Sequence, residues 1–445
     1  MSQTLIIHGT VVSPGNPDFV IEDGAVCVDG TTIAEVGTTA DLLPRYPGAA
    51  VVNAAGRVVM PGMVNGHMHL YSTFACGLAG EPAINFPEIL KKLWWKLDRA
   101  LSLEDVYYSA MVPYYRAIIS GTTTVIDHHA SPWAVKGSLR TLANAATAAG
   151  VRSSFCYEVS DRDGEESLEA GLAENAEFAG EVNGQGNMLR GMFGLHASMT
   201  VSQPTLERAV TMAKEVGAGI HVHAAEDISD QEDSLSKYGK RVVQRYHDAG
   251  ALGPKTILAH CIHVDAAERT LLQESGTFVA HNPESNMNNA VGAADILGML
   301  AQGIRVGLGT DGMTSNMIEE ARYAMLLQRQ VKADPTIAFG EAVDILVRNN
   351  AAFASEQFGT KLGTLEKGAA ADLIIVEHYP FTPISAANWY GHFLFGVHPS
   401  RVTHTMCNGR FLMAEGKVLT ISPEIVAAAA RKLSPLTWQR FTEIN

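Results

Sequence analysis

Histidine and acidic side chains that could bind a metal ion and activate water occur in four places along the sequence. The first is His67-Met68-His69. Side chains two positions apart on a β-strand point to the same face, so two imidazoles there can hold one metal ion. An HxH pair taken alone is more often incidental, so this interpretation depends on the other three places.

The second place joins histidine to a carboxylate in the stretch His221-Val222-His223-Ala224-Ala225-Glu226. Glu226 follows the apolar run at the position where a general acid/base must stand, near a metal ion but not necessarily bound to it. The competing interpretation is a polar loop after a strand. Periodicity alone does not choose between His221 and His223 as the metal ligand.

The remaining two places each supply one polar residue at the end of an apolar run. His260 follows Ile257-Leu258-Ala259 and could polarise a substrate oxygen or orient the attacking water; the alternative is a satisfied core histidine. Asp311 ends the Gly-rich run that begins at Val306. Burying an unpaired carboxylate there would be costly, and a metal ion or a protonated histidine removes that cost. The alternative for Asp311 is a turn that begins a helix.

Together the four places predict a site for one divalent metal ion. Three histidines and one aspartate form a ligand set that suits Zn²⁺ or Fe²⁺ and leaves a position for water. A metal ion lowers the pKa of such a water from about 16 toward about 7, so hydroxide is available at neutral pH. Because the four places lie far apart in the sequence, the fold must bring them together.

The elements that could do so are strand-like runs that end in histidine. Nine of the 16 histidines lie at such ends: His67, His69, His128, His129, His196, His221, His223, His260 and His281. Eight strands are predicted, at residues 58–67, 123–127, 152–157, 191–196, 219–223, 256–260, 277–281 and 305–311. Helical periodicity fills most of the gaps, which favours a parallel sheet. We therefore predict a (β/α)₈ TIM barrel over residues 61–361, with its active site at the carboxyl ends of the strands.

Both ends of the chain have a different pattern. Residues 1–60 and 362–445 contain short strands separated by Gly, Asp, Asn and Pro, which is typical of a small β-sandwich. We expect the two ends to form one discontinuous domain, with a helix around Ala427–Ala430. Within the barrel, Ser102 and Asp105 predict the capped start of a helix that ends at Gly121.

Composition excludes several classes of partner. The net charge is −14 and no Lys/Arg cluster could follow a phosphate backbone, so we expect no nucleic-acid polymer as a partner. No apolar run has the length of a membrane span. The chain begins without a basic region or a cleavage site, and its five cysteines include no CxxC pair. These features predict a cytoplasmic protein that does not associate with membranes.

The motifs, in their order, resemble those of the amidohydrolase superfamily, and more narrowly its cytosine deaminase/chlorohydrolase-like branch. The resemblance covers nearly the whole chain and is carried by Pro61–His69, His221–Glu226, Ala259–Cys261, Leu308–Gly312 and Gly363–Gly368 followed by Ala371–Leu373. Three further stretches are most similar to the SsnA-type aminohydrolases: Lys92–Leu101, Val125–Pro132 and Asn282–Asn289.

This resemblance implies a role for each of the polar residues. His67, His69, His223 and Asp311 would be the metal ligands, with His223 preferred to His221 because the family's ligand lies three residues before the glutamate. Glu226 would carry a proton between water and the leaving nitrogen. His260 would hydrogen-bond the hydroxide or the substrate, and Asp311 would also accept a proton from the water. The fourth strand lacks the lysine of the binuclear members, so one metal ion is expected, with Zn²⁺ favoured over Fe²⁺.

Four residues are predicted to contact the substrate. His196 lies at a position that often does so in the family, although the aromatic residue that usually follows it is missing. His128 follows the second strand and Asn286 follows the seventh. Trp94, beside Trp95, could stack on a planar ring or pack a helix onto the barrel.

The predicted function is hydrolytic deamination of a planar N-heterocycle, purine- or pterin-like, by a hydrolase acting on carbon–nitrogen bonds other than peptide bonds. The same residues could instead open a cyclic amide or displace chloride. An alternative of another class, a catalytically idle structural or binding homologue, would have lost ligands, whereas all six positions are intact. The substrate is expected to be a small heterocycle, and the resemblance implies a homo-oligomer.

Overall fold

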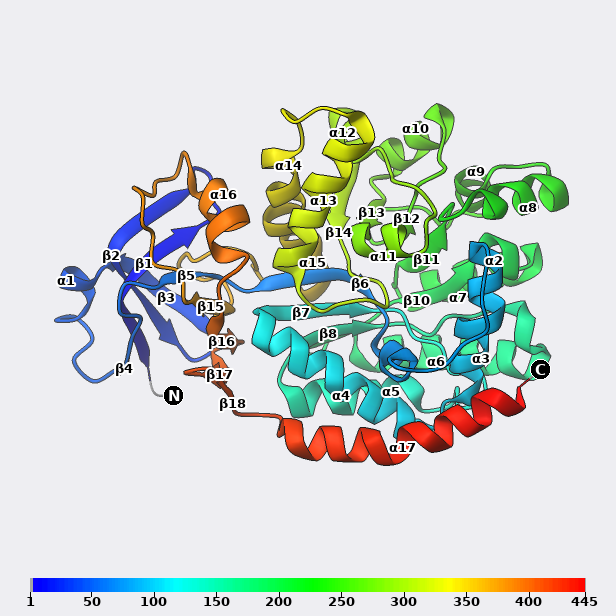
Figure 1. Cartoon of the computed structure of the whole chain (residues 1–445), viewed down its shortest axis with the longest axis horizontal. Coiled ribbons are helices and arrows are strands. Elements are labelled where there is room, and N and C mark those ends of the chain that lie inside the picture. Colours follow the sequence, from blue (N-terminus) through cyan, green and yellow to red (C-terminus); the bar gives the residue numbers. More distant parts are fainter. Residues whose placement is uncertain (1–2, 445) are drawn as a thin grey trace.

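The fold consists of one large mixed sheet and a region of alternating parallel strands and helices. The computed structural model describes residues 3–444. Figure 1 shows the mixed sheet on the left, the alternating region on the right, and the last helix running beneath that region.

The mixed sheet combines strands from both ends of the chain. Its order is β18-β17-β16-β15-β5-β1-β2-β3, with β4 paired to β1. The strands are β1 Thr4–Ser13, β2 Phe19–Asp29, β3 Thr32–Thr38, β4 Ala50–Asn53, β5 Val58–Pro61, β15 Leu373–Val376, β16 Val402–Cys407, β17 Arg410–Ala414 and β18 Lys417–Val418. The two ends meet at β5, which pairs parallel with β1 and antiparallel with β15. Buried Ile6, Val11, Ile375 and Met406 belong to the core on one face of this sheet.

The middle of the chain forms two parallel sheets of four and five strands. They contain β6 Met63–Met68, β7 Thr122–Asp127, β8 Arg152–Phe155 and β9 Leu189–Gly191, then β10 Phe193–Ala197, β11 Ile220–Ala224, β12 Ile257–His260, β13 Phe278–His281 and β14 Arg305–Leu308. Single parallel bridges join Met68, at the end of β6, to Asp311 after β14, and Val159, after β8, to Leu195 in β10. Nearly every strand residue is buried, as expected for strands covered on both faces.

Two predicted strands are each divided in the structure. Residues 58–67 form β5 in the mixed sheet and β6 in the parallel region, with Gly62 between them. A Cβ on Gly62 would lie 2.4 Å from Cγ2 of Thr123, so only glycine allows this close passage. The strand predicted at residues 191–196 is longer in the structure and divides at Met192 into β9, which pairs with β8, and β10, which pairs with β11.

The predicted helix start at Ser102 is confirmed. Helix α4 (Leu103–Ser120) begins with a capping box between Ser102 and Asp105 and ends at Gly121, whose φ is 80°. The helix predicted around Ala427–Ala430 is α17 (Pro423–Glu443). It packs against α3 (Trp95–Ala100) and α4, and its Trp438 donates a 2.8 Å hydrogen bond to the carbonyl of Phe74.

The other helices connect the strands of the two regions. The α-helices are α1 Thr39–Leu42, α2 Phe86–Ile89, α5 Ser138–Ala149, α6 Glu165–Val182, α7 Gln203–Glu215, α8 Ile228–Tyr238, α9 Val242–Asp248, α10 Ala266–Ser275, α11 Pro283–Asn288, α12 Ile296–Ala301, α13 Met317–Lys332, α14 Phe339–Asp344, α15 Ala351–Phe358 and α16 Trp389–His392. Short 3₁₀ or π segments are η1 Leu70–Ala75, η2 Leu90–Trp94, η3 Asp161–Asp163, η4 Ser198–Thr200, η5 Ile345–Asn350 and η6 Phe393–Val397.

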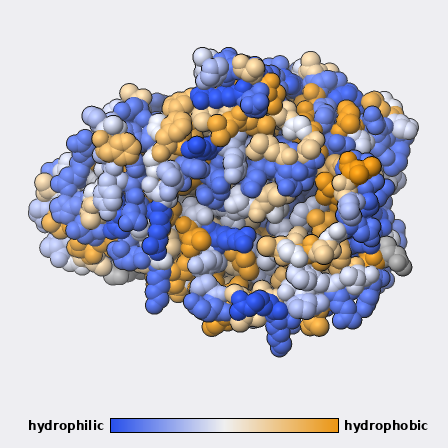
Figure 2. Space-filling model, viewed as in Figure 1, coloured by the Kyte–Doolittle hydropathy of each residue, from blue (hydrophilic) through white to orange (hydrophobic). Residues whose placement is uncertain are grey.

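The surface seen in Figure 2 mixes hydrophobic patches with hydrophilic side chains. Within residues 3–444, no helix is both long enough and apolar enough to cross a membrane.

Candidate active site

A pocket opens at the carboxyl ends of the parallel strands. Its volume, including the part open to solvent, is about 680 Å³, and it collects side chains that follow or end β6, β8, β10, β11 and β14. Its lining consists of His69, Tyr71, Phe86, Leu90, Trp94, Trp95, Glu158, Arg162, His196, Ala197, Met199, His223, Glu226, Asp227, Asp230, Asn289, Asp311, Gly312 and Met313. The edge of the sheets predicted to hold the active site is therefore where the polar residues gather.

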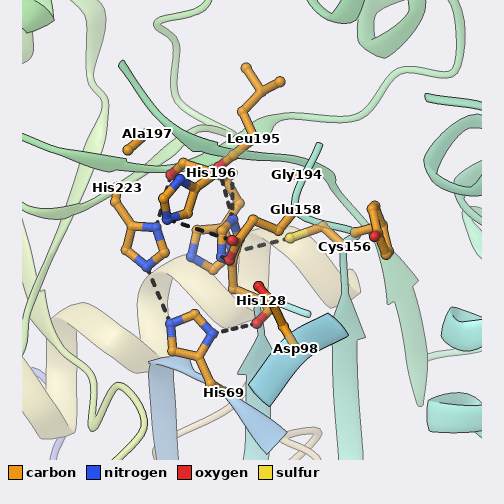
Figure 3. A network of polar contacts seen from close by, with 12 residues as sticks. His69, Asp98, His128, Cys156, Glu158, Gly194, Leu195, His196, Ala197 and His223 are labelled. Carbon is orange, nitrogen blue, oxygen red and sulfur yellow. Dashed lines mark hydrogen bonds and ion pairs between the residues drawn. The ribbon is translucent and has the colours of Figure 1, made fainter. Parts of the chain in front are cut away.

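Four buried side chains at this edge form what we call the ligand cluster: His67, His69, His223 and Asp311. One ligand atom from each lies within 4.8 Å of those from the other three. The Nε2 atom of His69 is 3.2 Å from Nε2 of His223 and 3.0 Å from Oδ1 of Asp311. Figure 3 shows the rings of His69 and His223 pointing toward each other.

Hydrogen bonds behind the ligand cluster leave its Nε2 atoms available. His223 donates from Nδ1 to the carbonyl of His196 at 2.8 Å, and His69 donates from Nδ1 to the carbonyl of His128. A carbonyl only accepts, so Nδ1 carries the proton and Nε2 presents a lone pair. Two such lone pairs facing each other at 3.2 Å repel unless a cation lies close to both.

His67 has the same arrangement with a different partner. Its Nδ1 is 2.8 Å from Nε2 of His221, whereas its own Nε2 is buried and has no hydrogen-bond partner within residues 3–444. His221 therefore stands behind the ligand cluster while His223 belongs to it. Unpartnered imidazole nitrogens beside a carboxylate match the donor set of a divalent metal site, so these residues fit the predicted metal ion.

Strands β6 and β14 hold the first and last members of the ligand cluster in register. The carbonyl of His67 accepts hydrogen bonds from the backbone N–H groups of Thr310, at 2.8 Å, and Asp311, at 3.0 Å. A Cβ on Gly309 would lie 2.6 Å from that carbonyl oxygen, so the approach requires glycine. Asp311 itself has a φ of 53°, a strained conformation that is common at functional sites.

Burial and neighbouring charges set the protonation of the ligand cluster. Burial, reinforced by the other histidines, lowers the pKa of His67 and of His223 well below the usual value. Burial opposes ionisation of both His69 and Asp311, but their shared hydrogen bond and opposite charges raise the pKa of His69 to about 9 and lower the pKa of the Asp311 carboxyl. A metal ion at Nε2 of His69 would take the place of that proton. Neutral imidazoles and an ionised carboxylate are the forms that bind metal ions.

Glu226 and His260 converge on the same point from β11 and β12. The Nε2 atom of His260 is 3.5 Å from Oε2 of Glu226 and 3.8 Å from Oδ2 of Asp311. Burial, and then the charge of Asp311, raise the pKa of Glu226 well above its usual value. A carboxyl that keeps its proton at neutral pH can deliver it to a leaving group.

The four predicted substrate contacts separate into two pairs. His196 and Trp94 line the pocket. His128 and Asn286 are fully buried and are not among its lining residues. The Nε2 atom of His128 lies 3.1 Å from each of the carbonyls of Leu195 and His221, and Asn286 accepts a 2.9 Å hydrogen bond from Nδ1 of His260. Both residues therefore support other site residues instead of facing the pocket.

Two charged residues of the pocket lining were not predicted from the sequence. They are Glu158 and Arg162, and neither was among the predicted site residues. Glu158 follows β8, so it is one more carboxylate just after a strand. A search of the ends of the predicted strands for acidic residues as well as histidines would have identified Glu158.

Comparison with known proteins agrees with the motifs. A family profile described as Amidohydrolase family matches residues 58–412, and one described as Imidazolonepropionase-like composite domain, bacteria, matches residues 24–49. The chain therefore belongs to the amidohydrolase family. It is a hydrolase of the deaminase type that acts on carbon–nitrogen bonds, which confirms the predicted enzyme class.

Three relatives illustrate the relationship. The chain is 32% identical over 439 residues to a 5-methylthioadenosine/S-adenosylhomocysteine deaminase of Moorella thermoacetica, covering 97% of this chain and 99% of that protein. It is 31% identical over 434 residues to a 5'-deoxyadenosine deaminase of Methanosarcina mazei, covering 96% and 97%. A solved adenosine deaminase from Xanthomonas campestris with bound zinc matches 100% of this chain and 99% of its own, with a TM-score of 0.86 and 23% identity. This last likeness shows a fold of the TIM-barrel type.

Proposed function

We propose that this enzyme removes the exocyclic amino group of an adenine nucleoside by hydrolysis. The observation that carries the proposal is the convergence of Glu226 and His260 on the ligand cluster at the base of the pocket. The relatives named as deaminases of adenosine derivatives supply the substrate class.

The ligand cluster would hold the metal ion, and its three nitrogens and one oxygen suit zinc. When bound, a divalent metal acts as a Lewis acid that lowers the pKa of water and polarises the reacting carbon–nitrogen bond. The residues of the chain then determine where the protons go.

Three side chains share the proton transfers. Ionised Asp311 accepts a proton as the water oxygen bonds to the ring carbon. Protonated Glu226 donates its proton to the amine, which leaves as ammonia when the carbon–nitrogen bond breaks. His260, whose Nε2 has no hydrogen-bond partner among the described residues, is placed to hydrogen-bond the attacking oxygen; Asn286 sets the orientation of its ring.

The parallel strands β6 to β14, which correspond to the eight predicted strands, are proposed to close into a barrel in which β6 lies beside β14. Asn350, in η5, supports this closure. Its side-chain amide donates to the carbonyls of Val64 and Leu308 at 2.7 Å each and accepts from the N–H of Leu308 at 2.8 Å. We call these contacts, with those between His67 and Thr310–Asp311, the β6–β14 seam.

The division into domains is also proposed. Residues 61–361 would form the barrel, and residues 1–60 with 362–445 a composite β-sandwich domain. The mixed sheet built from both chain ends supports it, as does the profile match at residues 24–49. Helix α17, within the second range, lies along the helices of the barrel.

Two further proposals concern the protein in the cell. The five cysteines are free thiols, which suits a reducing compartment such as the cytoplasm. A homo-oligomer is proposed from the resemblance alone, and its test is the mass measured by light scattering.

The experiment that tests the function measures ammonia release from adenosine, 5'-deoxyadenosine, 5'-methylthioadenosine, guanine, a pterin and a chlorotriazine, with enzyme of measured metal content. Ammonia from the adenine nucleosides at about one metal ion per chain is the expected result. Chloride release, or loss of ring absorbance without ammonia, would instead assign displacement or ring opening to the same residues. Inactivity across a broad panel with metal bound would support an idle homologue.

A further inference from the structure

Beside the ligand cluster, Glu158 and Arg162 line the pocket, and Asp98 and Asp163, outside its lining, pair with Arg162; the reaction does not use these four charged residues. We call Asp98, Glu158, Arg162 and Asp163 the ionic wall. Their side chains are between 1% and 8% exposed. Figure 3 shows Glu158 between His128, His196 and His223.

Three carboxylates surround the guanidinium of Arg162. It contacts Asp98, lies 2.9 Å from Oδ2 of Asp163 and 3.7 Å from Oε1 of Glu158. It also lies over the ring of Trp95, 5.2 Å from the centroid. Among the lining residues described, Arg162 is the only lysine or arginine. Its Nη1 has no hydrogen-bond partner within residues 3–444, but the carboxylates around it outnumber its single charge, so the pocket offers an anionic group no uncompensated lysine or arginine.

Glu158, in contrast, retains an unused acceptor. Its Oε2 is 3.2 Å from Nδ1 of His128 but is not aligned with it, and neither atom has a hydrogen-bond partner within residues 3–444. Its Oε1 is 3.6 Å from Nε2 of His196, the pocket residue expected to contact the substrate. An unsatisfied buried carboxylate oxygen costs free energy until a donor reaches it.

The other ionisable groups of the pocket lining are mostly carboxyl groups: Glu226, Asp227, Asp230 and Asp311. Glu158 adjoins the ligand cluster, since a carboxylate oxygen of it lies within 4.8 Å of a ring nitrogen of His69 and one lies within 4.8 Å of a ring nitrogen of His223. A phosphate or carboxylate on the substrate would thus meet more carboxyl groups than cationic side chains, and burying an anion without a charged partner is unfavourable.

We propose that the ionic wall selects substrates by charge: the site takes neutral heterocycles that present an O–H or N–H donor to Glu158, and it rejects those with phosphate or carboxylate groups. This inference rests on the proposed function for the identity of the ring. It predicts that neutral adenosine and 5'-methylthioadenosine are preferred to AMP and to S-adenosylhomocysteine, which carries a carboxylate.

The test measures dissociation constants by calorimetry, and ammonia release, for adenosine, 5'-methylthioadenosine, S-adenosylhomocysteine and AMP with the metal-loaded enzyme. We expect AMP to bind about 100-fold more weakly than adenosine, and S-adenosylhomocysteine about tenfold more weakly than 5'-methylthioadenosine, because each charge lacks a partner. Equal affinities within either pair would overturn the proposal, as would the failure of all four ligands to bind. Binding with the expected preference but without ammonia would reject the deaminase function and leave the charge selection intact.

Variants assign the effect to the ionic wall. Glu158→Gln keeps the shape of the side chain but removes its charge. The affinity for adenosine should therefore fall about tenfold, and the ratio of the dissociation constants of AMP and adenosine should become smaller. Asp163→Asn removes one of the negative charges that offset Arg162. AMP should then bind more tightly, which also makes the ratio of the two dissociation constants smaller. Glu274→Gln, on the exposed face of α10, removes the same charge and should change neither value. If the ratio of the dissociation constants of AMP and adenosine stays at the wild-type value in both variants, the ionic wall has a structural role only and does not select substrates.

Discussion

The ligand cluster and the ionic wall adjoin each other in one pocket, and their buried polar atoms find partners in different ways. In the ligand cluster, His69 and His223 satisfy one ring nitrogen against a backbone carbonyl, and the Nε2 atoms of the three histidines converge on Asp311. In the ionic wall, Arg162 pairs with three carboxylates, and Oε2 of Glu158, Oδ1 of Asp98 and Nη1 of Arg162 have no hydrogen-bond partner within residues 3–444. The first arrangement is completed by a cation, whereas the second already contains its cation and retains unused donors and acceptors. Catalysis and selection are thus assigned to separate side chains.

Removing a member of the ligand cluster should have the largest effect. His69→Ala is expected to bind metal at well below one ion per chain and to lose about 10⁴-fold or more in kcat/KM, because the Lewis acid supplies several kcal/mol. Plasma emission spectrometry and an ammonia assay measure both. His247→Ala, on an exposed part of α9, is the control and should change neither. Full metal occupancy in His69→Ala would exclude the proposed ligand set.

Glu226 lies beside the ligand cluster, and its substitution separates chemistry from metal binding. Glu226→Gln should lower kcat by about 10²–10⁴-fold, since no proton reaches the leaving amine, while the metal content stays unchanged. Single-turnover ammonia release with metal analysis on the same sample is the measurement. If metal were lost together with activity, Glu226 would be a ligand instead of a proton donor.

His196 belongs to the side of the pocket with Glu158, so its loss should affect binding more than chemistry. His196→Asn is expected to raise KM about tenfold, the value of one hydrogen bond, with little change in kcat. Steady-state kinetics with adenosine test this prediction. A fall in kcat at constant KM would place His196 in the chemical step and remove the distinction between the two sides.

Asn350 supports the ligand cluster from behind, so its effect should appear in stability. Asn350→Ala leaves the carbonyls of Val64 and Leu308 and one N–H without partners, and should reduce the free energy of unfolding by about 2–4 kcal/mol. The matched control, Asn349→Ala, removes one hydrogen bond to Val306 and should cost about 1 kcal/mol. Urea denaturation of the metal-loaded proteins compares the two. Equal losses would mean that Asn350 has no special part in the β6–β14 seam.

The difference between the two sides also explains what the sequence could predict. The ligand cluster follows from local pattern: each member ends an apolar run, and the carboxyl ends of parallel strands meet at one edge. The ionic wall combines α3, the loop after β8 and η3, whose charges are ordinary until they meet in three dimensions. His128 and Asn286 also follow strands, but their side chains contact backbone carbonyls and the ring of His260. These partners lie on neighbouring strands, so the local sequence does not reveal the direction of either side chain. The passage at Gly62 was missed because the close contact with Thr123 is tertiary.

The β6–β14 seam has a consequence for the order of events during synthesis. Asn65 donates to Thr310 across 245 positions, and Asn350 donates to Val64 across 286. At about 5–20 residues per second, the ribosome adds the intervening chain in roughly 15–60 s. During that time the edge of β6 that contacts β14 has no partner, because β14 has not yet been synthesised. His67 in β6 and His69 just after it are therefore in place before the rest of the site. A nascent chain that stops before residue 311 contains three of the four proposed metal ligands but cannot complete the site, so we expect metal loading to be a late event in the maturation of this enzyme.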